Sequence, residues 1–184
     1  MKGKVFVINL ASAVERRKNI TAQLHKQRIE FQIVDAINGQ HLSPEANPEV
    51  DWDFASRNAF WVSKGLLACS LSHLKAYRAI VDQNLPYGLV LEDDTVLLPG
   101  LADFLLRIET HLHENEVLML YYAAWEKCVL TAKGSLTIGQ RRIVTPQNPR
   151  QLVSANAYII TNRACRDVLH FQTPLKTTSD SWGV

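Results

Sequence analysis

The sequence predicts an α/β protein in which helices flank a mostly parallel central sheet. Residues 4–9 contain a short apolar run, unbroken over residues 5–8 and rich in β-branched side chains, which is typical of a strand covered on both faces. A helix ending near Gln27 and a second strand over residues 29–34 are expected to follow. Strand, helix and strand in this order form the right-handed crossover that joins parallel strands.

Local signals describe the first helix and the long connection after the second strand. Ser12 and Glu15 have the spacing of a capping box, in which both side chains accept hydrogen bonds from free N–H groups at the start of a helix. Residues 38–64 hold one glycine and two prolines among polar and aromatic residues. Because this connection is longer than a routine one, we expect a functional loop with local helical turns.

The second half of the chain continues the alternation of helices and strands. Residues 65–84 carry apolar side chains at helical spacing, and Pro86 ends this helix before a buried strand over residues 87–91. Pro99 suits the first turn of the next helix, which is expected to reach His111. The other expected elements are a strand at 117–121, a hairpin within 125–145, a strand at 157–160 and a helix from Asn162.

The bulk composition is that of an ordinary globular protein and excludes several classes. The 184 residues, 47% apolar and 21% charged, fit one domain over residues 1–184. The 20 basic and 18 acidic residues leave a net charge of +2, which is too balanced for a nucleic-acid-binding surface. No apolar run approaches the roughly 20 residues of a membrane span, and we expect no signal peptide.

The cysteines indicate a reducing compartment. Cys69, Cys128 and Cys165 are odd in number and widely spaced, without a C-x-x-C pair, so the sequence predicts neither a disulfide framework nor a zinc site. We therefore expect a cytoplasmic protein. Peripheral contact with the inner membrane surface stays open, because a few basic residues are enough for it.

A cluster of carboxylates, Glu92, Asp93 and Asp94, stands directly after the expected strand 87–91. The carboxyl ends of strands in open α/β sheets form the ligand crevice, so negative charge is concentrated where a ligand binds. Mg²⁺ and Mn²⁺ take carboxylate oxygens and share the rest of their shell with phosphates. The cluster therefore predicts a metal site for a phosphorylated substrate. The alternative is a solvated turn in which Asp93 and Asp94 cap the next segment.

Several short blocks occur together, in this order and spacing, in one known family. The blocks are Val5-Phe6-Val7-Ile8-Asn9-Leu10, Glu15-Arg16-Arg17, Val34-Asp35-Ala36 with Gly39, Cys69-Ser70-Leu71-Ser72-His73, and Leu91-Glu92-Asp93-Asp94. With them the chain resembles glycosyltransferase family 25, which includes bacterial lipooligosaccharide galactosyltransferases. The resemblance weakens beyond Leu101 and returns near residues 157–160 and at Ser179-Asp180.

The resemblance implies a GT-A-type nucleotide-sugar-binding domain, a UDP-sugar donor, commonly UDP-galactose, and a Mn²⁺ or Mg²⁺ cofactor. It implies transfer of a hexose, with inversion, to a glycolipid or oligosaccharide acceptor of the lipooligosaccharide type. A metal that bridges the two phosphates stabilises the charge that develops on the UDP leaving group. Asp94 is the expected direct ligand, Glu92 reaches the metal, its water shell or the ribose, and Asp93 orients the turn.

Candidates for donor binding lie at the ends of the first two strands. Asn9, Leu10 and Arg16 come just past the first strand, where an open α/β sheet holds its nucleotide, and Arg16 or Arg17 is placed to contact phosphate. Asp35 ends the second strand and is expected to accept hydrogen bonds from ribose or uracil. The alternatives are arginines solvated on the first helical turns and an aspartate that only forms a turn.

The block on the helix over residues 65–84 adds two further candidates. Ser72 and His73 are assigned to the substrate site, although a helical histidine is more often a packed residue with one satisfied nitrogen. Cys69, in the same block, is expected to belong to the core.

Displacement with inversion also requires a base that takes the proton of the acceptor hydroxyl. Asp180 is the preferred base, because Trp182 beside it is placed to stack on a sugar ring. The alternative for Asp180 is an exposed acid near a frayed terminus, in which case Glu126 is the substitute base.

Two other functions remain open. A nucleotidyltransferase that forms an activated sugar would use the same metal and strand-end geometry, but no glycine-rich, lysine-containing phosphate loop occurs near residue 10. A non-catalytic nucleotide-sugar-binding module is suggested by two departures from the family. Gly65-Leu66-Leu67-Ala68 replaces the family's Gly-Glu-Ile-Gly, and the sequence stops at Val184 although members are generally longer.

Overall fold

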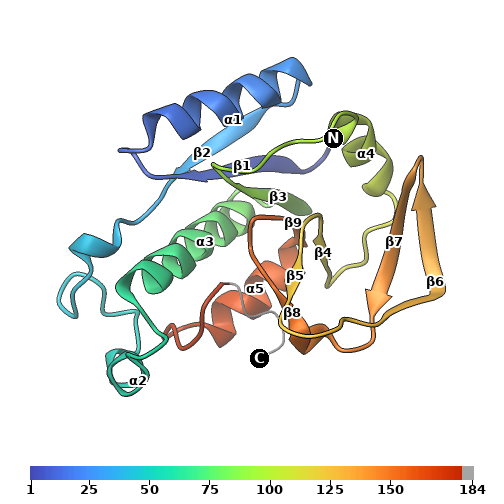
Figure 1. The fold of residues 1–184 in the computed structure, drawn as a ribbon. Coiled ribbons are helices and arrows are strands. Elements are labelled where there is room, and N and C mark those ends of the chain that lie inside the picture. The colour runs from blue at the N-terminus through green and yellow to red at the C-terminus, as the bar shows by residue number, and fades with distance from the viewer. Residues whose placement is uncertain (180–184) are drawn as a thin grey trace.

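The computed structural model describes residues 1–179 and has a five-stranded sheet at its centre (Figure 1). The strands, in the order in which they lie side by side, are β2 (Phe31–Asp35), β1 (Lys4–Asn9), β3 (Tyr87–Glu92), β9 (Ala157–Thr161) and β4 (Val117–Met119). β1 pairs in parallel with β2 and β3, whereas β9 is antiparallel to β3 and β4. The predicted α/β class with a mostly parallel sheet is confirmed.

Helices cover both faces of this sheet, which explains why β1, β3 and β9 are buried along nearly their whole length. α1 (Val14–Lys26) and α4 (Leu101–Ile108) lie over one face, and α3 (Lys64–Asp82) and α5 (Asn162–Phe171) over the other (Figure 1). In β1, Val7 belongs to the same buried cluster as Ile20 of α1, whereas Phe6 belongs to the cluster of Ile80 of α3. No helix in the described part of the chain is long and apolar enough to span a lipid bilayer.

The long connection between β2 and α3 contains the expected helical turns. They are η1 (Gly39–His41) and α2 (Trp52–Arg57). Asp51 caps α2 by accepting the backbone N–H of Phe54 at 2.8 Å. A Cβ atom on Gly39 would lie 2.9 Å from the carbonyl oxygen of Lys64, so only glycine lets η1 approach the start of α3 this closely.

The capping-box prediction for the first helix is wrong. Ala13 occupies the N-cap position of α1, and no side chain caps this helix, so Ser12 does not have the expected role. The reason is a backbone turn after β1, in which the N–H of Ala13 bonds to the carbonyl of Leu10 at 2.8 Å. Glu15 instead pairs with Lys18, 2.7 Å away on the exposed side of the helix.

The helix expected from Pro99 to His111 is shorter than predicted. Gly100 precedes it with a φ of 83°, a left-handed conformation that favours glycine. α4 therefore begins only at Leu101, and it ends at Ile108. The strand expected over 117–121 is also shorter, since β4 ends at Met119.

A hairpin stands beside the central sheet, as expected within residues 125–145. Its strands are β6 (Leu130–Ile138) and β7 (Arg141–Pro146), drawn in orange in Figure 1. Gly139 in the connecting turn has a φ of 58°. Ile138 and Ile143 pack against the core on the α4 side of the sheet. Shorter elements between β4 and β9 are β5 (Ala123–Ala124), η2 (Pro149–Gln151) and β8 (Leu152–Val153).

The direction of β9 decides which residues lie near the acidic cluster. β9 runs antiparallel to β3, with Ala157 opposite Leu91. The residues just before β9 therefore lie at the carboxyl end of β3. In addition, the backbone N–H of Glu92 donates to the carbonyl of Asn156 at 2.9 Å.

Candidate active site

The carboxyl ends of three parallel strands meet at one edge of the sheet. Asn9 at the end of β1 is in register with Asp35 at the end of β2, and Ile8 is in register with Glu92 at the end of β3. The acidic cluster therefore lies at the carboxyl edge of the sheet, as the sequence predicts. Its three carboxylates have three different surroundings, and these differences limit what each can do.

Asp93 is the buried carboxylate of the cluster, with 7% of its surface exposed. The side-chain amide of Asn9 donates to Asp93 Oδ2 at 2.6 Å, and the half-exposed Arg16 guanidinium lies 3.3 Å from Oδ1. The Asn9 amide also donates to the carbonyl of Ala13 at 3.3 Å. Asp93 thus joins the end of β3 to the turn between β1 and α1.

Asp94 is the exposed carboxylate, and one residue holds it in place. The side-chain amide of Asn156 donates to Asp94 Oδ1 at 3.0 Å. Asn156 is itself fixed, because the Thr95 hydroxyl donates to its side-chain oxygen at 3.0 Å and its backbone N–H donates to the Ser154 hydroxyl at 3.3 Å. Within residues 1–179, Oδ2 of Asp94 has no hydrogen-bond partner, so it is available to a ligand.

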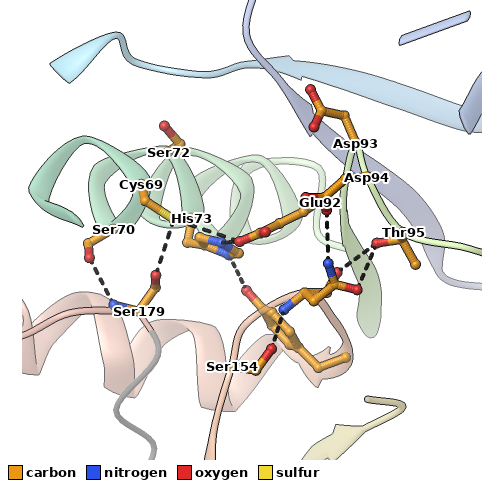
Figure 2. Close-up of polar contacts among 12 residues, drawn as sticks. Cys69, Ser70, Ser72, His73, Glu92, Asp93, Asp94, Thr95, Ser154 and Ser179 are labelled. Atoms are coloured by element: carbon orange, nitrogen blue, oxygen red, sulfur yellow. Dashed lines mark hydrogen bonds and ion pairs between the residues drawn. The ribbon is translucent and has the colours of Figure 1, made fainter. Parts of the chain in front are cut away.

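Glu92 points away from the other two carboxylates, toward α3 (Figure 2). Its Oε1 atom lies 3.4 Å from Nε2 of His73 and 3.7 Å from the sulfur of Cys69. His73 is fully buried, and its Nδ1 shares a hydrogen bond of 2.6 Å with the Tyr158 hydroxyl. The Tyr158 hydroxyl lies 2.6 Å from that of Tyr77, so a chain of buried polar groups ends at Glu92.

These surroundings determine which of the hydrogen-bonded groups between Tyr77 and Glu92 are ionised. The hydrogen bond from His73 lowers the pKa of the Glu92 carboxyl below its ordinary value, and partial burial opposes this effect only in part. Burial raises the pKa of the Tyr77 and Tyr158 hydroxyls well above 10.0, so both phenols stay protonated. Glu92 is therefore a carboxylate at the end of a chain of buried hydrogen-bonding groups, two of which are protonated phenols.

The other residues assigned to the substrate site are placed as follows. Ser72 is buried, and its hydroxyl accepts the backbone N–H of Ile37 at 2.8 Å, which ties the end of β2 to α3. Leu10 is partly buried in the turn after β1. Asp35 is exposed, and its backbone carbonyl accepts a hydrogen bond from the Lys75 ammonium. Leu10 and Asp35 lie along the carboxyl edge, whereas the Ser72 hydroxyl is engaged with the backbone.

The preferred base, Asp180, and Trp182 lie outside the described residues. Ser179, the last described residue, lies beside α3, because its backbone N–H donates to the Ser70 hydroxyl at 2.8 Å and its hydroxyl lies 3.5 Å from the sulfur of Cys69. The substitute base Glu126 is exposed on the segment between β5 and β6.

Sequence reasoning missed Asn156 and misplaced Cys69. Asn156 precedes a strand, and only the antiparallel direction of that strand brings it to Asp94. The sequence did contain a signal for this direction. Parallel neighbours need a crossover of a dozen or more residues, usually a helix, and no helix is expected between the strands at 117–121 and 157–160, so an antiparallel last strand could have been predicted. Cys69 was expected in the core, but it is only partly buried and faces Glu92.

The site offers two kinds of metal-binding atoms. Asp94 presents a carboxylate oxygen at the exposed edge, which suits hard cations such as Mg²⁺ and Mn²⁺. Cys69, His73 and Glu92 offer sulfur, nitrogen and oxygen atoms that all lie within 4.8 Å of one another. The carboxylate of Asp94 therefore fits the expected oxygen-bound ion, whereas the sulfur, nitrogen and oxygen atoms of the other three residues favour softer metals.

Comparisons with known proteins identify the family of the chain. Residues 2–182 match the family profile described as glycosyltransferase family 25, LPS biosynthesis protein. The chain is similar to procollagen galactosyltransferase 1-B of Xenopus laevis, with 28% identity over 182 residues, or 91% of this chain and 28% of that protein. It is also similar to the lacto-N-neotetraose biosynthesis glycosyltransferase LgtB of Neisseria meningitidis, with 35% identity over 99 residues, or 54% of this chain and 35% of that protein.

The chain thus spans about a third or less of the length of these two relatives. The family match, in contrast, extends over nearly all of the chain and includes every strand of the central sheet and the whole acidic cluster. The chain belongs to glycosyltransferase family 25.

Proposed function

We propose that this protein transfers a hexose, namely galactose, from a UDP-sugar to an oligosaccharide or glycolipid acceptor, with inversion and with the help of a divalent metal. The observation that carries the proposal is Asp94, whose carboxylate stands exposed at the carboxyl end of β3 and is oriented by Asn156. The relatives named galactosyltransferases support the choice of sugar. The GT-A type of fold is part of the same proposal and is supported by the mostly parallel sheet.

Asp94 is the proposed direct ligand of a Mn²⁺ or Mg²⁺ ion, and Glu92, whose side chain points toward α3, is proposed to reach that ion through its water shell. Glu92 is suited to it because its bonds to His73 and Cys69 use Oε1, and within residues 1–179 its Oε2 has no partner. The bound ion would supply positive charge against the diphosphate, where negative charge develops as UDP leaves. Asn156 keeps the Asp94 carboxylate oriented for this contact.

The donor nucleotide is proposed to lie along the carboxyl edge of β1 and β2. Leu10 and Asp35 flank this edge, and Arg16 is half-exposed beside it, where its positive charge favours a phosphate. Asp180 is the proposed base for the acceptor hydroxyl. Its neighbour Ser179 lies against Cys69, next to the acidic cluster, which supports this choice.

An incubation of the protein with UDP-galactose, Mn²⁺ and an oligosaccharide acceptor is expected to release UDP and to yield a lengthened acceptor. Mass spectrometry of the acceptor and a coupled assay for UDP measure the two products. Release of pyrophosphate from a sugar phosphate and UTP would identify a nucleotidyltransferase instead. Saturable binding of UDP-galactose without either product would identify a binding module.

Three exposed aromatic side chains are proposed to hold the acceptor. Tyr121, Tyr122 and Trp125 lie on the segment that contains β5, and exposed apolar groups of this size mark binding surfaces. The segment lies near Asp94, because the backbone N–H of Tyr121 donates to the carbonyl of Ala157, the residue after Asn156. Their rings offer flat apolar faces on which a sugar ring can stack.

Replacing Trp125, which is 80% exposed, with alanine is expected to raise the KM for the acceptor about tenfold, because about 1.5 kcal/mol of apolar contact is lost. Binding of the UDP-sugar should not change. Phe60, a similarly exposed aromatic that follows α2, is the matched control. Phe60→Ala should leave both the KM for the acceptor and the Kd for the UDP-sugar unchanged. An unaltered acceptor KM in the Trp125→Ala variant would exclude this residue from the acceptor site.

A further inference from the structure

Three side chains, two from α3 and one from the end of β3, bring different metal-binding atoms together beside the acidic cluster (Figure 2). Cys69 and His73 stand on α3, and Glu92 ends β3. The sulfur of Cys69 and Nε2 of His73 both face the same oxygen, Oε1 of Glu92, at 3.7 Å and 3.4 Å. Two different groups therefore converge on one carboxylate oxygen.

The two separations from Oε1 of Glu92, 3.4 Å to Nε2 of His73 and 3.7 Å to the sulfur of Cys69, are close to the edges of a tetrahedral metal site. Zinc lies about 2.0–2.3 Å from nitrogen, oxygen and sulfur ligands, so neighbouring ligand atoms in a tetrahedron are about 3.4–3.6 Å apart. A separation of 3.4 Å between Nε2 of His73 and Oε1 of Glu92 is long for a hydrogen bond but ordinary for two ligands of one ion. Cys69 and His73 are four positions apart, so the helix places both on one face.

The groups behind His73 are those that a metal-binding histidine needs. Nδ1 of His73 shares a hydrogen bond of 2.6 Å with the Tyr158 hydroxyl, and Tyr158 bonds in turn to Tyr77. When a metal ion takes the place of the hydrogen bond between Nε2 and Glu92, the imidazole proton lies on Nδ1 and donates to Tyr158, and the lone pair of Nε2 faces the ion. Such outer partners fix the tautomer and the ring orientation of ligating histidines. Both tyrosines are buried, so this support is rigid.

We propose that Cys69, His73 and Glu92 form a zinc site, distinct from the oxygen-bound metal at Asp94. Sulfur, nitrogen and carboxylate ligands together favour Zn²⁺ over Mg²⁺ and Mn²⁺, which prefer oxygen. Three protein ligands leave the fourth position to a water molecule or to the Ser179 hydroxyl, which lies 3.5 Å from the Cys69 sulfur. Cys69 and Glu92 are partly exposed, so an ion can enter from solvent.

Binding of Zn²⁺ at this site releases one proton and also affects the acidic cluster. The Cys69 thiol loses its proton to the buffer as the Zn–S bond forms, and the other two ligands bind without their protons. Glu92 belongs to both metal sites through its two oxygens. We therefore expect Zn²⁺ to fix Glu92 against α3, while Mn²⁺ or Mg²⁺ still binds at Asp94.

The test uses the full chain without nucleotide or sugar, so its outcome does not depend on the proposed transferase activity. Calorimetric titration with Zn²⁺ is expected to show one tight site per chain, with a heat that varies with the ionisation enthalpy of the buffer. Titration with Co²⁺, a spectroscopic substitute, is expected to produce a cobalt–thiolate absorption band. Cys69→Ser should remove this band and weaken Zn²⁺ binding by about 100-fold or more.

Cys128→Ser is the matched control, because Cys128 is also a partly buried cysteine outside any disulfide but has no place in the triad, and this variant should bind Zn²⁺ as the parent does. Asp94→Asn should also keep the zinc site. The absence of a cobalt–thiolate band in the parent protein would overturn the proposal without the need for any variant. A band that survives Cys69→Ser, or one that disappears in Cys128→Ser, would overturn it as well.

Discussion

Replacing Asp94 with asparagine is expected to abolish metal-dependent binding of the UDP-sugar and to lower the rate of transfer by about 100-fold or more. The proposed metal contributes several kcal/mol of charge stabilisation, and each 1.4 kcal/mol corresponds to about tenfold in rate. Asparagine has the same shape as aspartate but lacks its charge. Because Asp94 is exposed, this change should leave the fold intact.

Calorimetric titration of UDP-galactose with and without Mn²⁺ measures the effect, and a transfer assay gives the rate. Asp103→Asn is the matched control, since Asp103 is an exposed carboxylate on α4 that pairs with Arg107 at 2.8 Å. This variant should bind and transfer like the parent protein. Unchanged metal-dependent binding in Asp94→Asn would refute the assignment of the metal to Asp94.

Replacing Asn9 with leucine is expected to lower the free energy of unfolding by about 2 kcal/mol. The side-chain amide of Asn9 donates to the buried Asp93 carboxylate at 2.6 Å, and leucine cannot replace this charge-assisted bond. Loss of a bond to a buried charged group costs about 1.5–3 kcal/mol. Asn9 Oδ1 is buried without a partner within residues 1–179, so its removal offsets part of the loss.

Urea unfolding followed by circular dichroism measures this change. Asn115→Leu provides the control, because its amide also donates to a carboxylate, Asp167, at 3.0 Å, but at the exposed surface. We expect that variant to lose less than about 0.5 kcal/mol. Equal losses in the two variants would mean that the burial of Asp93 adds nothing to the strength of its bond with Asn9.

Much of the fold follows from local sequence patterns. Unbroken apolar runs such as residues 5–8 predict strands covered on both faces, and α3 follows from the helical spacing of its leucines. The position of the acidic cluster also follows, because a strand that ends in carboxylates places them at the sheet edge in any parallel arrangement. These features depend on neighbouring residues and not on long-range pairing.

Other features of the site depend on contacts between distant segments, and the sequence alone does not predict them. The direction of β9 results from pairing with β3 and β4, and it alone brings Asn156 to Asp94. α1 begins after Ala13 and not after Ser12, because the Ala13 N–H bonds to the Leu10 carbonyl in a backbone turn and the Ser12 hydroxyl does not cap the helix. The sequence predicts no zinc site because it has no C-x-x-C pair, and the proposed triad depends instead on the packing of α3 on β3, which brings Cys69 to Glu92.

The buried tyrosine pair behind His73 has a consequence for how tightly ligands bind. Tyr77 and Tyr158 join α3 to β9 through a hydrogen bond of 2.6 Å, and both rings are packed in the core. The rotational freedom of His73, and through it that of Glu92, is therefore lost when the chain folds and not when a ligand arrives. Because folding has already ordered these side chains, a metal ion or a nucleotide that contacts Glu92 binds with a smaller loss of side-chain entropy and therefore more tightly.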